Sequence, residues 1–336
     1  MAENKLYKIG ITHGDMNGIG YEVIIKALSD NKMMEICTPI VYGLSKTASL
    51  HRKTLDIQDF SFQFIKNTEQ LSVKKPNLIN LYEEEVKVDI GTSTKLAGQM
   101  AERALYAAGR DLKNKNIDAV VTAPINKNNI QSDKFVFPGE TEFFEHYFGG
   151  STYSALMMMI ADELRIGFVT NDIPTAKVSS ALSKDLIYKK LKILNHTLRQ
   201  DFNIANPTIA VLAFNPHASD ESLVGKEEAE HISPAIELAF QEHINAFGPF
   251  PADSFFSTGH YRKFDAVLAM YHDQGMIPFK LLTNEGVNYT AGLPIVHTAP
   301  AHGTAYDIAG KNAADCQSMR NAIYLAVDIL RNRQNG

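Results

Sequence analysis

The sequence predicts an α/β fold that contains much parallel sheet. Short apolar runs alternate with helical patterns along the chain, as expected when helices connect parallel strands. Three of the apolar runs end abruptly in polar residues, and the carboxyl ends of strands are where such sheets bind ligands. At 336 residues the chain can form one large or two medium domains, and we find no internal repeat.

The expected elements follow one another without a long linker. Residues 7–12 are expected to form the first strand and residues 21–28 the helix after it. A long helix follows Gly91, where Ser93 or Thr94 can cap it. Leu96, Met100, Ala104 and Ala107 would fall on one face of that helix. The other expected elements are strands over 118–124, 208–214 and 265–271, a hairpin over 155–170 turning at Asp162-Glu163, and helices over 184–202 (capped by Ser183), 235–247 (opened by Ser233-Pro234) and 318–333.

The composition is typical of a soluble globular protein, with 45% hydrophobic and 21% charged residues. A net charge of -5 offers no general attraction to nucleic acid. Cys37 and Cys316 are the only cysteines and lack CxxC spacing, which argues against a disulfide scaffold and favours a reducing compartment. No signal peptide is evident, and the longest apolar stretch, 155–161, is too short to span a membrane. We therefore expect a cytoplasmic protein that binds neither nucleic acid nor membrane.

The polar residues at strand ends include good ligands for a metal ion. His217 follows the strand 208–214, and His272 and Asp273 come directly after the strand 265–271. Asp172 lies just beyond the hairpin. Imidazole and carboxylate groups bind Zn²⁺ and similar divalent ions. No two of them have a short HxxxH spacing, so an ordinary hydrogen-bonding role for either histidine stays open. After His272, we expect Gly275 and Pro278 to break the chain.

The glycine-rich segment 10–20 lies between the first strand and its helix, and it has two interpretations. Glycine permits close approach to a phosphate, but it equally permits a tight turn. The glycines at 10, 14, 18 and 20 do not match G-x-G-x-x-G, so no dinucleotide fingerprint is present. Lys127 and Lys280 follow strand ends and could hold an anion or lie on the surface.

Eight segments, taken in order, resemble the 4-hydroxythreonine-4-phosphate dehydrogenase family of vitamin B6 biosynthesis. The resemblance begins near residue 8 and extends to the last helix. The segments are ITHGDMNGIG, VTAPINK, FPGETEF, LAFNPHASD, FGPFPADSFF, AMYHDQG, GVNYTAGLPIV and HGTAYDIAGK.

This resemblance implies an isocitrate/isopropylmalate dehydrogenase-like fold, in which two α/β domains flank a cleft. One domain would comprise residues 1–138 and 300–336 and contribute to NAD binding. The other, 139–299, would carry the metal and substrate residues and the interface of a homodimer. NAD, or NADP, is expected in the cleft between the domains, at residues that the resemblance does not identify.

The family reaction is the oxidation of 4-phosphooxy-L-threonine by NAD⁺, followed by loss of CO₂ to give 3-amino-2-oxopropyl phosphate. It uses one divalent metal ion per subunit (Zn, Mg, Mn or Co), held by three histidines contributed across the dimer. His217 and His272 match two of these ligands. Asp172 occupies the position of the third, and a carboxylate there would change the metal preference.

The expected substrate residues combine matches with departures. Thr141, Lys280 and Asn288 match family positions, whereas Glu140 replaces a histidine and His297 an arginine. Ala301 also stands where the family has an aspartate. Arginine grips phosphate through a charged fork that histidine lacks, and an ionised Glu140 would repel an anionic substrate. Asp253 and Asp273 are the expected catalytic residues, in proton transfer or in support of the ligands.

These departures leave four functions open. The chain could catalyse the family reaction, or it could be a related dehydrogenase with a different phosphorylated hydroxy acid as substrate. It could also be a catalytically impaired homologue that binds a metabolite. The fourth possibility is a metal-dependent hydrolase built on the same His/Asp cluster.

Overall fold

The computed structural model describes residues 6–335, which form two compact α/β units. Among these residues, unit 1 comprises 6–150 and 294–331, and unit 2 comprises 151–293 and 332–335. The predicted α/β class is confirmed. The domain boundaries expected at residues 139 and 300 stay a prediction. No helix in the described range is both long and apolar enough to cross a lipid bilayer.

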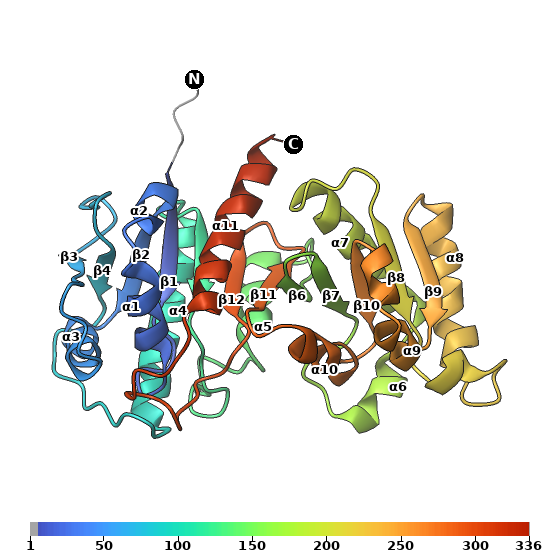
Figure 1. Ribbon diagram of the computed structural model, residues 1–336, viewed down its shortest axis with the longest axis horizontal. Helices are drawn as coiled ribbons and strands as arrows, with labels where there is room; N and C mark the ends of the chain where they lie inside the picture. Colours follow the sequence, from blue (N-terminus) through green and yellow to red (C-terminus); the bar gives the residue numbers. More distant parts are fainter. Residues whose placement is uncertain (1–5, 336) are drawn as a thin grey trace. The chain divides into compact units, whose positions relative to one another are not determined.

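Unit 1 is built on a parallel sheet with the strand order β3-β4-β2-β1-β5-β12 (Figure 1). Its strands are β1 (Tyr7–Thr12), β2 (Cys37–Gly43), β3 (Gln63–Ile65), β4 (Asn77–Asn80), β5 (Ala119–Thr122) and β12 (His297–Pro300). Its helices are α1 (Gly20–Leu28), α2 (Met33–Ile36), α3 (Ser45–Thr54), α4 (Lys95–Lys113), α5 (Glu140–Phe144), a π-helical turn (Glu145–Gly149) and α11 (Gln317–Asn335), whose last residues belong to unit 2. β1, β2 and β5 are almost entirely buried, as expected for strands with helices on both faces.

The long helix α4 begins where the sequence predicts. The side chain of Thr94, rather than Ser93, accepts a hydrogen bond from the backbone N–H of Ala97. Met100 and Ala104 are buried as expected. Leu96 is instead 36% exposed, because the apolar face of α4 is centred on small residues such as Ala101 and Ala108.

The glycine-rich segment is packed inside unit 1, where residues 11–20 are all buried. Gly14 has φ +67°, and a Cβ there would lie 2.4 Å from the carbonyl oxygen of Pro124. A Cβ on Gly18 would lie 2.6 Å from the carbonyl oxygen of Thr304. These glycines are therefore required by close backbone packing, and the segment does not form an open phosphate cradle.

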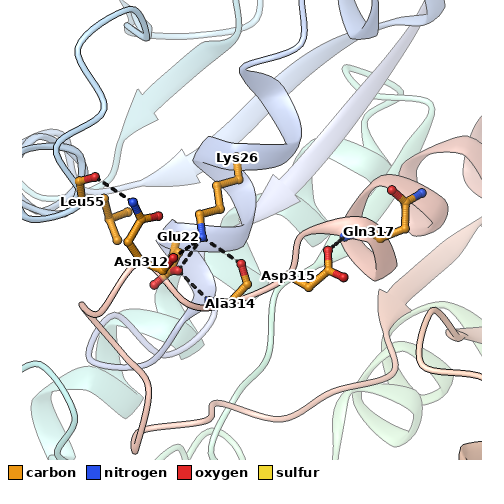
Figure 2. Close-up of polar contacts among 7 residues, drawn as sticks. All are labelled: Glu22, Lys26, Leu55, Asn312, Ala314, Asp315 and Gln317. Atoms are coloured by element: carbon orange, nitrogen blue, oxygen red, sulfur yellow. Dashed lines mark hydrogen bonds and ion pairs between the residues drawn. The ribbon is translucent and has the colours of Figure 1, made fainter.

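A polar cluster joins α1 to the loop that precedes α11 (Figure 2). The carboxylate of Glu22 accepts hydrogen bonds from Lys26 Nζ and from the backbone N–H of Ala314, both at 2.8 Å. Lys26 Nζ also donates to the carbonyl oxygens of Asn312 and Ala314. Asp315 then accepts a hydrogen bond from the backbone N–H of Gln317, at the first residue of α11. Because Glu22 is buried, the cluster holds this loop in one position.

Unit 2 has a mixed sheet with the strand order β11-β6-β7-β10-β8-β9. β6 pairs antiparallel with β11 and β7, whereas the pairs β7–β10, β10–β8 and β8–β9 are parallel. Its strands are β6 (Leu156–Ala161), β7 (Leu164–Phe168), β8 (Thr208–Leu212), β9 (Asn245–Phe250), β10 (Ala266–Ala269) and β11 (Val287–Ala291). Its helices are α6 (Val178–Ala181), α7 (Lys184–Gln200), α8 (Ser233–Gln241), α9 (Ala252–Ser257) and α10 (His272–Leu282), with short helical turns at Thr175–Lys177, Pro216–Ser219, Glu228–Ile232 and His260–Lys263.

Two expectations for unit 2 are wrong. The helix expected over 235–247 ends at Gln241, because the chain reverses at His243, with φ +60°, and residues 245–250 pair with β8. Gly275 and Pro278 do not break the chain, since both lie inside α10. A Cβ on Gly275 would lie 2.6 Å from the ring of Phe168. Glycine thus lets α10 pack against β7, and this packing outweighs the cost of an internal proline.

Unit 1 also buries a stack of three rings. His13 lies 5.2 Å from Tyr21, and Tyr21 lies 5.1 Å from His51, measured between ring centroids. Burial lowers the pKa of His13 from 6.5 to about 4, and the neighbouring His51 acts in the same direction. The folded state therefore holds His13 neutral at a pH where the unfolded chain already binds a proton.

We expect His13 to destabilise the protein in mild acid. Its contribution is complete above pH 6.5 and is lost as pH falls towards 4, with about 2 kcal/mol lost between pH 7 and pH 5. Urea unfolding measures the free energy of unfolding at pH 7 and at pH 5. The decrease between these pH values should be about 2 kcal/mol smaller in His13→Gln than in the wild type. His196→Gln, an exposed control on α7, should retain the wild-type difference. Equal pH dependence in wild type and His13→Gln would exclude this role.

Candidate functional site

The carboxyl ends of three neighbouring parallel strands meet at one edge of the unit 2 sheet. β10 lies between β7 and β8 and pairs with both. Asp172 follows β7, His272 follows β10 and His217 follows β8, so the three predicted ligands leave the sheet at the same edge. The sequence shows three strands that end in polar residues, and two of them, β8 and β10, end at this edge. The third, which ends at 122–127, belongs to unit 1. The third strand at this edge is β7.

Two adjoining hollows open at this edge. The first, which we call the Asp172 hollow, has a volume of about 290 Å³ and is lined by Asp172, His272 and Asp273, among others. The second, the His217 hollow, has a volume of about 590 Å³ and is lined by His217, Asp253 and again Asp273. Asp273 thus belongs to both hollows, and so does Tyr271.

Asp273 also orients the imidazole of His272. The Nδ1 atom of His272 lies 2.7 Å from Oδ1 of Asp273. A proton shared at Nδ1 leaves the Nε2 lone pair of the neutral ring available to a ligand. A carboxylate behind a histidine is the usual support for a metal-binding imidazole, because it selects the tautomer and increases the basicity of the ring.

The loop after β8 is strained and firmly held. Residues 217–222 all have positive φ, between 46° and 74°, although none is glycine. Buried Glu228 accepts hydrogen bonds from the backbone N–H groups of Phe214 and Asn215 and from the side-chain amide of Asn215. Glu227 accepts bonds from Ser179 and Asn215, which lower its pKa to about 2. These contacts compensate for a backbone that costs free energy at each left-handed residue.

The donor set suits a divalent cation, but the described part of one chain does not complete a site. Two imidazoles and a carboxylate are appropriate ligands for Zn²⁺, Mn²⁺ or Co²⁺. Asp172 and His272 line the same hollow, whereas His217 lines its neighbour. Among residues 6–335, no three His, Cys, Asp or Glu side chains are grouped closely enough to hold a metal ion. The fit within one chain is therefore partial.

Glu140 and His297 meet in unit 1 through Thr122. The Oγ1 atom of Thr122 lies 2.9 Å from Nε2 of His297, and Thr122 also hydrogen-bonds the carboxyl group of Glu140. His297 is 1% exposed, its ring lies 4.3 Å from that of Phe144, and burial lowers its pKa to about 3. His297 is therefore a neutral, buried residue rather than a cationic substitute for arginine.

Burial also changes the charge of Glu140. It raises the pKa of this carboxyl group to about 7, although the Thr122 hydrogen bond and Lys127 act in the opposite direction. The Oε1 atom of Glu140 is buried without a hydrogen-bond partner. Near pH 7 this group is about half protonated, and its acid form is a neutral hydrogen-bond donor.

The remaining predicted residues line neither hollow. Lys280 is exposed on α10 and lines neither of them. Asn288 lies in β11 opposite Met159, and Thr141 is buried in α5. Ala301 directly follows β12.

A second polar network, which the sequence patterns do not indicate, lies in unit 1. Buried Asp15 accepts hydrogen bonds from the amide of Asn129 at 2.7 Å and from the hydroxyl of Tyr306 at 2.8 Å. Asn126 donates to the same hydroxyl. The available signal was a single aspartate, Asp15, within a glycine-rich segment. The side chains of Asn129 and Tyr306 that bond it lie more than a hundred residues away in the sequence.

Comparison with known proteins gives a consistent result. The sequence model of the family described as pyridoxal phosphate biosynthetic protein PdxA matches residues 35–326. A 4-hydroxythreonine-4-phosphate dehydrogenase of Bacteroides thetaiotaomicron is 49% identical over 99% of this chain and 91% of that protein. A protein of Oceanobacillus iheyensis, provisionally named D-threonate 4-phosphate dehydrogenase, is 36% identical over 96% of this chain and 97% of its own. The crystal structure of 4-hydroxythreonine-4-phosphate dehydrogenase from Klebsiella pneumoniae superposes with a TM-score of 0.82 at 31% identity, covering 98% of this chain and 99% of that one.

Glu228→Ala should destabilise unit 2 by about 3 kcal/mol, because three N–H donors lose their acceptor at roughly 1 kcal/mol each. Urea unfolding measures this loss. Glu230→Ala, an exposed change in the same helical turn, is the matched control and should cost much less. If both variants lose the same stability, Glu228 does not hold the end of β8.

Proposed function

This chain belongs to the family of the pyridoxal phosphate biosynthetic protein PdxA, and we propose that it is a metal-dependent, NAD-linked oxidoreductase acting in pyridoxal phosphate biosynthesis. Its substrate would be 4-phosphooxy-L-threonine. NAD⁺ (or NADP⁺), when bound, would accept a hydride from the secondary alcohol carbon as the hydroxyl loses its proton. The resulting β-keto acid loses CO₂ to give 3-amino-2-oxopropyl phosphate. The observation that carries the proposal is the similarity, over nearly the whole chain, to relatives named 4-hydroxythreonine-4-phosphate dehydrogenase, which are 49% and 37% identical.

The groups proposed for chemistry are those at the carboxyl ends of β7, β10 and β8. Asp172, His217 and His272 would hold the divalent ion, and Asp273 would keep the Nε2 atom of His272 available. When bound, such an ion supplies positive charge that lowers the pKa of the substrate hydroxyl and stabilises developing negative charge. Asp253 lines the His217 hollow and is proposed to accept or return a proton there.

We further propose that a second copy of this chain completes the site, in a homodimer. The apolar side chains of α10 beside the His217 hollow support this. Ile277 is 59% exposed and Leu281 81% exposed, and both line that hollow. Leu282 is 46% exposed. An exposed apolar helix face beside a site that one chain does not complete is well suited to a second subunit.

Metal content and molar mass together test these assignments. Asp172→Ala is expected to lower the bound metal, measured by mass spectrometry, while light scattering still finds a dimer. Ile277→Lys combined with Leu281→Lys should give a monomer that also loses metal. Asp133→Ala and Leu50→Lys, exposed changes of the same kinds in unit 1, should alter neither quantity. Full metal occupancy in Asp172→Ala would remove Asp172 from the ligand set, and a wild-type monomer would exclude the shared site.

Glu140 is compatible with an anionic substrate when it is protonated. We propose that its acid form donates a hydrogen bond to the substrate, with Thr122 and His297 holding the carboxyl group in place. As pH rises through about 7, Glu140 loses its proton, so the donor is lost and a negative charge faces the phosphate.

The KM for the phosphorylated substrate should therefore rise between pH 6 and pH 8, by up to about tenfold per pH unit above the Glu140 pKa. Glu140→Gln keeps a neutral donor at every pH and should flatten this rise. Glu237→Gln, on the exposed side of α8, should retain the wild-type profile. A profile that is equally steep in Glu140→Gln would show that another group titrates.

A second candidate function has a specific observation in its favour. His297 is neutral and buried, so it cannot provide the charged fork expected from arginine at this position. A related dehydrogenase acting on another phosphorylated hydroxy acid would tolerate this change. The Oceanobacillus relative, named for D-threonate 4-phosphate, supplies a concrete alternative substrate.

NADH formation at 340 nm separates the candidates. The wild type should reduce NAD⁺ with 4-phosphooxy-L-threonine when Zn²⁺, Mg²⁺, Mn²⁺ or Co²⁺ is supplied. Reduction with D-threonate 4-phosphate alone would favour the second candidate. Phosphate release without NADH would indicate a hydrolase, and binding of both compounds without turnover would indicate an inactive homologue.

A further inference from the structure

Unit 1 contains a third hollow, well separated along the chain from the groups proposed for chemistry. It has a volume of about 1000 Å³ and lies between α4 and the carboxyl ends of two parallel strands. Lys66 directly follows β3, and residues 79–81 end and follow β4. We call it the β4–α4 hollow. Carboxyl ends of parallel strands are the usual location of ligand sites in α/β sheets.

The lining of this hollow is strongly basic, although the chain as a whole carries a net charge of -5. Its charged residues are Lys66, Arg103, Arg110 and Lys134, opposed by Glu102 alone. All four cations are exposed, and none of them forms an ion pair with another described residue. Four unpaired cations around one concavity concentrate positive potential there and attract anions.

The same lining offers flat aromatic surfaces. Residues 103, 106 and 110 are spaced by three and four along α4, which places two arginines and Tyr106 on one face of the helix. The rings of Tyr106 and Tyr147 meet edge to face at 6.3 Å. The hydroxyl of Tyr106 donates to the carbonyl oxygen of Lys134, which holds the ring in position. Tyr106 therefore contributes a ring held in position beside exposed cations.

We propose that the β4–α4 hollow binds a small phosphate ester that carries a planar ring, of about the size of a nucleoside monophosphate. Arg103 and Arg110 present planar forks suited to bidentate contact with phosphate oxygens. Tyr106 is suited to stacking on a ring, whereas the ring of Tyr147 is itself covered by Phe143 and Lys113. The volume corresponds to ligand pockets of roughly 300–1,000 Å³. A regulatory ligand held here would be independent of the dehydrogenase function proposed above.

Binding of AMP, measured by isothermal titration calorimetry on the full chain, tests this proposal. AMP should bind more tightly than either inorganic phosphate or adenosine. Inorganic phosphate lacks the ring that would contact the tyrosine, and adenosine lacks the phosphate that would contact the arginines. Arg103→Glu combined with Arg110→Glu should weaken AMP binding by about tenfold or more, because charge-assisted hydrogen bonds to phosphate are replaced by repulsion. Lys189→Glu combined with Arg199→Glu, the same change of charge on the exposed face of α7, should leave it unchanged.

Two further observations keep the test decisive. Lys66→Ala combined with Lys134→Ala alters exposed side chains outside helices and should also weaken AMP binding if the arginine variant does not fold. The KM for NAD⁺ should be unchanged in both hollow variants. AMP binding that equals phosphate binding, or that survives both hollow variants, would overturn the proposal. The second result would assign AMP to a different site, such as that of the dinucleotide.

Discussion

The parallel pairing of β7, β10 and β8 is the constraint on which the candidate site depends. Strands that run in the same direction release their following residues at the same edge of the sheet. Along the chain, 45 residues separate Asp172 from His217 and 55 residues separate His217 from His272. Adjacent strands nevertheless bring all three to that edge. An antiparallel β10 would have placed His272 at the opposite edge. The strand directions therefore decide which carboxylates and imidazoles can act together.

Around this edge, hydrogen bonds and close packing hold the backbone, while the candidate ligand side chains remain accessible. Glu228 is buried and satisfies the amides at the end of β8, whereas His217 itself is exposed. Gly275 allows α10 to pack tightly on β7, whereas His272 at its first residue is only partly buried. Side chains that bind ligands must be accessible to solvent. Their positions are therefore set by buried neighbours, here Glu228 and Gly275.

Burial determines the charge of Glu140 and His297, the two departures at expected substrate positions. On the basis of charge alone, Glu140 and His297 suggest repulsion at one position and a weak cation at the other. Inside unit 1 the negative charge of Glu140 is weakened and the positive charge of His297 is lost, because desolvation favours the neutral form of each group. In the pair linked through Thr122, His297 is thus neutral and Glu140 is about half protonated near pH 7. A change in chemical recognition, from ionic to neutral, is compatible with retention of the surrounding fold.

The sequence by itself determined the α/β class, the first residues of α4 and α7, the hairpin of β6 and β7 and the family, because these follow from local periodicity, capping residues and linear motifs. It did not determine that α10 continues through Pro278, since the packing of Gly275 on Phe168 involves residues far apart in the chain. It left the glycine-rich segment ambiguous, because only the backbone at Pro124 and Thr304 shows that the glycines are needed for packing. The tertiary structure alone decided the strand order and the protonation states of Glu140 and His297. The strand order depends on pairing between distant segments, and the two protonation states depend on which distant groups exclude water from each side chain. No local sequence pattern encodes either.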